Sequence, residues 1–107
     1  MTKLCRTNID KLIRNTYKVF KKANKDKVDT SMTFRLNDSY KAEIAMECVT
    51  PTENEDPSKI DGGDLTYYII NSKGVAIDQV TLGWVCFDDN IDEKANKELS
   101  YLLNMYC

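Results

Sequence analysis

The chain of 107 residues contains no histidine. This absence excludes Ser-His-Asp and Cys-His nucleophilic centres, histidine-based zinc sites, and imidazole as a pH sensor. Only 4 glycines and 2 prolines are present, and none of the glycines forms a phosphate-binding loop or a nucleophile elbow. We therefore expect a protein without enzymatic activity, catalytic residues or a cofactor.

Closely spaced cysteines are also absent. Cys5, Cys48, Cys86 and Cys107 lie far apart, with no C-x₂-C pair to anchor a zinc ion. A disulfide between Cys5 and Cys107 requires the two ends of the chain to lie side by side, and a cytoplasmic setting argues against it. We expect four reduced thiols, with Cys48 and Cys86 as small core residues, and no bound metal.

No long hydrophobic run is present. The apolar stretch Tyr67–Ile70 is far too short to cross a bilayer, and residues 1–5 lead directly into a charged segment without a signal-peptide core. We expect a cytoplasmic protein with no membrane partner. Twelve lysines against three arginines, with nine asparagines, fit an AT-rich genome such as that of a low-GC bacterium or its phage.

Apolar residues recur with a helical period over residues 8–24, where Ile9, Leu12 and Phe20 share one face. Thr7 stands in the position of an N-cap. A second helix is expected to open with Asn90 as its cap and Glu93 three residues later.

Four segments between these helices follow the period-2 pattern of strands. Residues 27–36 and 40–48 alternate cleanly and predict a hairpin with one solvated face. Residues 65–70 and 75–87 predict a second hairpin, apolar on both faces, in which alternation puts Leu82 and Trp84 on the same side. Gly74 suits the left-handed position of the turn, and Gly83 indicates a bulge or bend.

The polar segment 51–64 lies between the two hairpins and predicts a long acidic surface loop. The expected fold is a single α+β domain over residues 1–107 with the order α-β-β-β-β-α. In this fold an antiparallel meander sheet carries both terminal helices.

Charge is divided unevenly along the chain. Residues 1–30 carry nine basic and three acidic side chains, whereas residues 31–107 carry six basic and fourteen acidic ones. Such an asymmetry concerns partners more than fold.

Acidic residues and two aromatic residues of the second part form a candidate partner-binding set. If they converge, their field can occupy a basic groove on another protein, with the aromatic side chains as anchors. The competing interpretation is that the loop carboxylates only keep the chain soluble. The set comprises Glu43, Glu47, Glu53, Glu55, Asp56, Asp61, Asp64, Tyr68 and Trp84.

Six cations of the first helix fall within a sector about 100° wide. They define an alternative function, binding along a nucleic-acid backbone. A solvated outer face or a site for an acidic protein would show the same pattern. The six are Lys11, Arg14, Lys18, Lys21, Lys22 and Lys25.

These observations favour a small protein-binding module that inhibits a nucleic-acid-handling host enzyme. Small anti-CRISPR-type inhibitors of phages and mobile elements share this general character, although no motif links them to this chain. Two alternatives stay open: nucleic-acid binding by the first helix, and a homodimeric structural or assembly protein built on an exposed sheet face.

Overall fold

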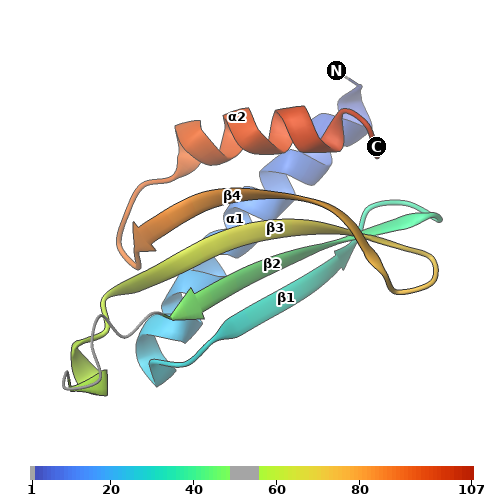
Figure 1. Cartoon of the computed structure of the whole chain (residues 1–107). Helices are drawn as coiled ribbons and strands as arrows, with labels where there is room; N and C mark the ends of the chain where they lie inside the picture. Colours follow the sequence, from blue (N-terminus) through green and yellow to red (C-terminus); the bar gives the residue numbers. More distant parts are fainter. Residues whose placement is uncertain (1, 49–55) are drawn as a thin grey trace.

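The computed structural model describes residues 2–48 and 56–107. A helix, four strands and a helix follow one another, which confirms the α-β-β-β-β-α order expected from the sequence (Figure 1). The bounds are α1 Lys3–Asp26, β1 Thr30–Arg35, β2 Tyr40–Cys48, the 3₁₀ turn η1 Pro57–Lys59, β3 Gly62–Asn71, β4 Ala76–Cys86 and α2 Asp92–Leu103. No helix in the described ranges combines the length and the apolar content that a bilayer crossing requires.

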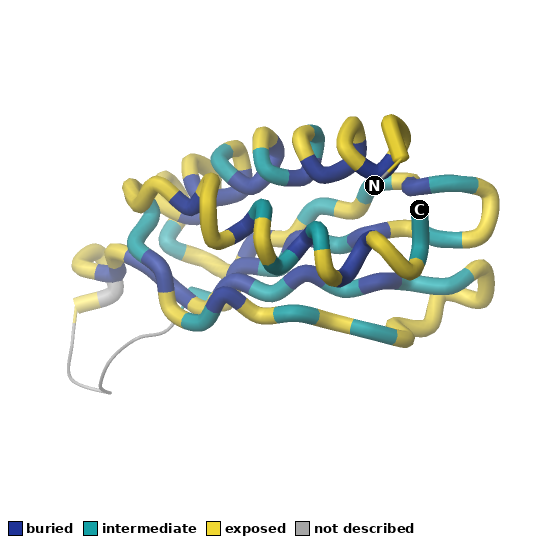
Figure 2. The backbone as a smooth tube through the Cα atoms, turned by 90° about the horizontal axis from the view of Figure 1, so that it is seen from above, coloured by how far each residue is buried: buried dark blue, intermediate teal, exposed yellow. Residues whose placement is uncertain are grey.

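The four strands form one antiparallel sheet in the order β1-β2-β3-β4, and both helices pack on the same face of it. Helix α1 contacts β1 and β2, α2 contacts β4, and the two helices contact each other. Figure 2 shows the buried residues gathered between the helices and the sheet. The sheet therefore has one covered face and one open face.

The core between the layers contains a buried polar pair. The hydroxyl oxygens of Thr16 on α1 and Tyr67 on β3 lie 2.6 Å apart, and Thr16 also donates to the carbonyl of Leu12 at 2.7 Å. Both side chains are fully buried among apolar neighbours such as Phe20 and Ile44. Since buried hydroxyls are costly without partners, this bond fixes the position of α1 along the sheet.

Helix α1 begins five residues earlier than the sequence pattern predicts. Thr2 is the N-cap, and its hydroxyl accepts the N–H of Cys5 at 3.1 Å, so Thr7 lies inside the helix instead of capping it. The hydroxyl of Thr7 donates to the carbonyl of Lys3. The extra turn carries Cys5 into a buried position.

The predicted capping box of the second helix is not formed. The N-cap of α2 is Ile91, whose side chain cannot accept a hydrogen bond. Asn90 lies one residue earlier and accepts the N–H of Asp92 at 3.0 Å. Asp92 and Glu93 lie in the first turn, where their charges favour the positive end of the helix dipole.

Strand β3 begins inside the predicted loop 51–64, at Gly62, so Asp64 belongs to a strand. Glycine is unfavourable in strands, but packing requires it at these two positions. A Cβ at Gly62 would lie 2.8 Å from Cζ2 of Trp84, and one at Gly63 would collide with the carbonyl oxygen of Glu47. Close approach of neighbouring groups explains why a Gly-Gly pair starts the strand.

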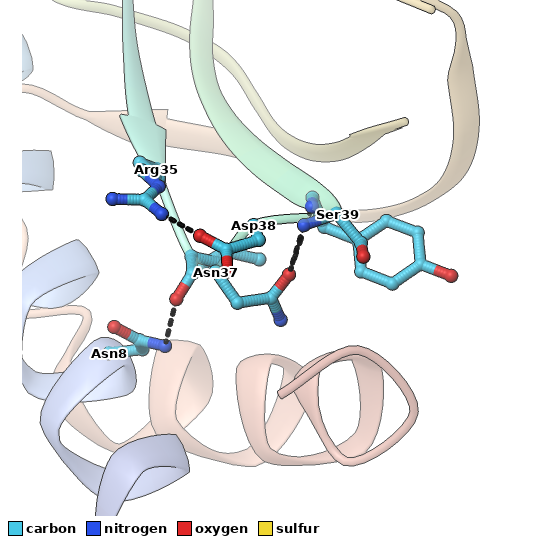
Figure 3. A network of polar contacts seen from close by, with 7 residues as sticks. Asn8, Arg35, Asn37, Asp38 and Ser39 are labelled. Carbon is cyan, nitrogen blue, oxygen red and sulfur yellow. Dashed lines mark hydrogen bonds and ion pairs between the residues drawn. The ribbon is translucent and has the colours of Figure 1, made fainter. Parts of the chain in front are cut away.

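The turn between β1 and β2 is held by a polar network (Figure 3). The side-chain oxygen of Asn37 accepts the backbone N–H groups of Ser39 and Tyr40 at 2.8 and 3.0 Å, which is the hydrogen-bond pattern by which asparagine stabilises turns. Its amide nitrogen donates to the carbonyl of Tyr106 at 2.8 Å. Arg35 pairs with Asp38 in the same turn. The turn is thereby connected to the segment that follows α2.

A disulfide joins Cys5 and Cys107, whose Cα atoms are 5.3 Å apart, so the expectation of four reduced thiols is wrong. The two ends of the chain lie side by side (Figure 1), because α1 starts early enough to meet the end of α2. Cys48 and Cys86 are free and half-buried instead of fully buried.

We expect Cys107→Ser to lower the free energy of unfolding by about 3–5 kcal/mol, since the bond closes a loop of roughly a hundred residues. Urea denaturation of the oxidised protein measures this loss. A reductant should bring the wild type to the level of the variant, and Cys48→Ser should respond to reductant as the wild type does. An unchanged urea midpoint for Cys107→Ser would contradict the bond's stabilising role.

Candidate protein-binding face

The open face of the sheet carries five of the nine predicted partner-binding residues. Side chains alternate along each strand, and residues paired across neighbouring strands share a face. Glu43 pairs with Tyr68, Glu47 with Asp64, and Asp64 with Trp84. All five point away from the helices. We call them the acidic sheet patch: Glu43, Glu47, Asp64, Tyr68 and Trp84.

Two of the three carboxylates of the acidic sheet patch are neighbours, and the third lies further along β2. Glu47 and Asp64 are on neighbouring strands, about 5 Å apart at the backbone, and Glu43 lies about 13 Å from Glu47 along β2. None of the three forms an ion pair within residues 2–48 and 56–107. Their negative charge is therefore available to a partner.

A β-bulge places Trp84 on this face. Leu65 pairs with Gly83 and Thr66 with Thr81, which leaves Leu82 as an extra residue in β4. Gly83 takes the left-handed φ of 73° that the bulge requires, as its position in the sequence indicates. The bulge separates two side chains that regular alternation puts together: Leu82 is 3% exposed, whereas Trp84 is 51% exposed.

Trp84 lies against the glycine at the start of β3. Its ring lies close to Gly62, where the backbone carries no side chain, and Asp64 is its partner on the neighbouring strand. Tyr68 is half-buried and lies four residues further along β3 than Asp64. Sequence patterns do not identify Gly62 as part of this site, because its role depends on the pairing of β3 with β4.

Further carboxylates border the patch at the end of the sheet where β4 stops. Cys86 pairs with Gly62 and shares the open face with Trp84. Partial burial raises the pKa of the Cys86 thiol, and the negative charges of Asp89, Asp61 and Asp88 raise it further. Asp88 and Asp89 lie beside this thiol, and Asp61, a member of the predicted set, adds to the same negative field.

Cys86, Asp88 and Asp89 also present ligand atoms within 4.8 Å of one another, the one such group found in the described part of the chain. Hydrogen bonding accounts for this clustering, because Asp89 accepts the backbone N–H of Cys86 at 2.8 Å. We assign no metal to it.

Three predicted residues lie elsewhere. Glu53 and Glu55 are outside the described residues. Asp56 is exposed beside the 3₁₀ turn, where its carboxylate accepts the N–H of Ser58 at 2.9 Å, and this hydrogen bond lowers its pKa. Asp56 therefore has a local structural role at the start of the turn.

The predicted basic stripe lies on the opposite side of the molecule, on α1. Arg14, Lys18, Lys21, Lys22 and Lys25 are exposed, and Lys11 is half-buried with its Nζ 5.4 Å from the centre of the Phe34 ring. Helix α1 packs on the sheet through its other side. The acidic and basic residues therefore occupy opposite surfaces.

A hollow of about 680 Å³ lies between α1 and α2, and Ile13 and Tyr17 are among its apolar lining residues. Charges of both signs surround it, including Arg14 and Glu93, and Arg6 pairs with Asp10 at 2.8 Å. Because opposite charges are mixed around the hollow, it favours no class of ligand.

Comparison of the chain with known protein families, characterised proteins and solved structures finds no significant match.

The electrostatic environment of Cys86 can be measured directly. In a Cys48→Ser background Cys86 is the remaining free thiol of the oxidised protein. We expect Asp61→Asn with Asp88→Asn to lower the pKa of this thiol and to speed its alkylation by iodoacetamide at pH 8, since the thiolate is the reactive form. The pH dependence of the alkylation rate gives the shift in this pKa.

The control variant is Glu93→Gln with Glu98→Gln, which removes two charges from α2 and should leave the pKa of the Cys86 thiol unchanged. An unmoved midpoint in the first variant would contradict the clustering of carboxylates around Cys86.

Proposed function

We propose that this chain is a small non-enzymatic protein-binding module whose acidic sheet patch docks on a basic surface of a partner protein. One observation supports this: the strand register collects Glu43, Glu47, Asp64, Tyr68 and Trp84 on the one sheet face that the helices leave uncovered. Glu47 and Asp64 are exposed and Glu43 is half-buried, and none of them is ion-paired in the described part of the chain, so they provide charge complementarity. Two aromatic rings provide apolar anchors.

A nucleic-acid-binding groove is the kind of basic surface that fits this patch best. Such grooves present lysine and arginine to phosphates and often planar side chains to bases. Carboxylates about 5 and 13 Å apart offer an alternative set of anions, and Tyr68 and Trp84 offer aromatic faces. The module would then exclude DNA or RNA from the groove and act as an inhibitor, as a phage or a mobile element would use against a host enzyme.

A second copy of the chain suits the same surface less well. A two-fold pair through the acidic sheet patch would bring one set of Glu43, Glu47 and Asp64 close to the same set in the partner copy. Like charges facing each other destabilise an interface. A different, basic protein is therefore the occupant that we propose.

The proposed target places the interaction in the cytoplasm of a bacterium or an infected host. Thiol pools there keep most cysteines reduced. In that compartment the Cys5–Cys107 bond would be open to reduction, whereas the acidic sheet patch lies on the sheet and does not include either cysteine.

The test is capture of a partner from nuclease-treated bacterial lysate on immobilised protein, quantified by mass spectrometry. We expect a protein that binds the wild type, is lost with E43Q/E47Q/D64N, and is released by added duplex DNA, because the DNA and the acidic sheet patch compete for the same cations of the groove. The matched variant D26N/E93Q/E98Q removes three carboxylates from the helices and should still capture the partner protein.

Three results would overturn the proposal: equal capture by both triple variants, capture only before nuclease treatment, or a wild-type mass that rises with concentration and falls to the monomer on Trp84→Asp. The last result would assign the face to a second copy of the chain.

A further inference from the structure

The basic stripe of α1 is more strongly segregated in charge than the outer side of α2. Residues 11–25 contain six cations and no carboxylate. Five of the cations are exposed, and none of the six forms an ion pair within the described residues. The other exposed residue in this stretch is Asn24, so no apolar side chain is exposed along the stripe.

Helix α2 provides an internal comparison, since it packs on the same sheet face and also exposes its other side. Its outward residues mix the two signs, with Glu93 and Lys94 adjacent and Lys97 and Glu98 following them. Such a mixture of acidic and basic side chains is sufficient to keep the outer side of a helix solvated. Segregation of one sign on α1 therefore needs a further reason.

The stripe also places like charges in contact range. Arg14 and Lys18, Lys18 and Lys22, and Lys21 and Lys25 are separated by four residues, the spacing at which side chains on a helix are neighbours. Like charges at this spacing destabilise a helix. A bound polyanion would remove that repulsion.

We propose that this stripe binds the phosphate backbone of double-stranded nucleic acid without reading its base sequence. Six cations spread over about 21 Å of helix have a mean spacing of about 4 Å, which is comparable to the charge spacing of about 3.4 Å per strand along the DNA axis. An acidic protein would require apolar anchors at the centre of its interface, and the stripe exposes none.

A duplex fits better than a single strand. Single-strand binding depends on aromatic side chains that stack on bases. Phe34, whose ring centre lies 5.4 Å from Nζ of Lys11, is half-buried. Tyr17 on α1 is also half-buried, and its hydroxyl accepts the N–H of Ile91 at 3.2 Å and donates to Asp92. Its ring is held in the contact between the helices and is not available for stacking.

The experiment measures binding of a fluorescently labelled 20-bp DNA duplex by anisotropy between 25 and 150 mM salt. Full engagement of the six cations gives a slope of log affinity against log salt of about −5. We expect K18Q/K21Q/K25Q to reduce this slope by nearly 3 and to weaken binding at least tenfold at 25 mM salt. The matched control K59Q/K73Q/K97Q, which removes three exposed lysines from other surfaces, should change both values by less than half as much.

A second readout separates binding from a structural role of the lysines. Without DNA, K18Q/K21Q/K25Q should raise Tm by a few degrees, because it removes repulsion within α1. A lower Tm, no binding at 25 mM salt, equal losses in both triple variants, or preference for a single strand of the same sequence would each overturn the proposal.

This surface and the acidic sheet patch lie on opposite sides, so the two proposals fail independently. We expect E43Q/E47Q/D64N to keep the DNA affinity and salt slope of the wild type or to bind somewhat more tightly. A loss of DNA binding in that variant would overturn the assignment to α1.

Discussion

Coverage of only one sheet face by both helices is the constraint on which the rest of this structure depends. Apolar side chains of every strand point toward the covered face. The hydroxyl pair of Thr16 and Tyr67 fixes the place where α1 crosses that face. Because no further helix or strand within residues 2–48 and 56–107 lies on the other face, the strand residues that alternate with the core residues stay accessible there. The choice of residues buried on the covered face therefore determines which residues of each strand are accessible on the open face.

The same constraint separates the charges in space. Helix α1 turns its apolar side to the sheet and its lysines outward, while the carboxylates lie on the far surface of β2 and β3. The net charge of −2 therefore combines a basic helix face with a sheet face that carries Glu43, Glu47 and Asp64, with the cations Arg35 and Lys41 at its β1–β2 turn end. Such a separation of charge gives the molecule a dipole, which orients it as it approaches a charged partner and raises the rate of productive encounter. Salt would weaken this orientation before it weakens contacts at short range.

Periodicity is sufficient to predict the elements and the clean alternation of β2, and hence that Glu43 and Glu47 share a face. The position of Trp84 relative to Asp64 is not predictable in this way. The bulge at Gly83 adds one residue to β4, so every later side chain of that strand points to the opposite face from the one that regular alternation predicts. The expectation of four reduced thiols rests on a different ground, the reduced state of cysteines in the cytoplasm. Pairing Cys5 with Cys107 requires the early start of α1, where few apolar residues reveal the helix.

The disulfide also has a mechanical consequence. Residues 5 and 107 are joined through sulfur, so a force applied across them passes through the covalent bridge and bypasses the sheet and both helices. Oxidised protein would resist such a pull as a rigid link that does not lengthen. After reduction, the same force would reach α1 and the strands and could extend about a hundred residues of chain to more than 300 Å. The redox state of one bond therefore decides whether this fold carries tension.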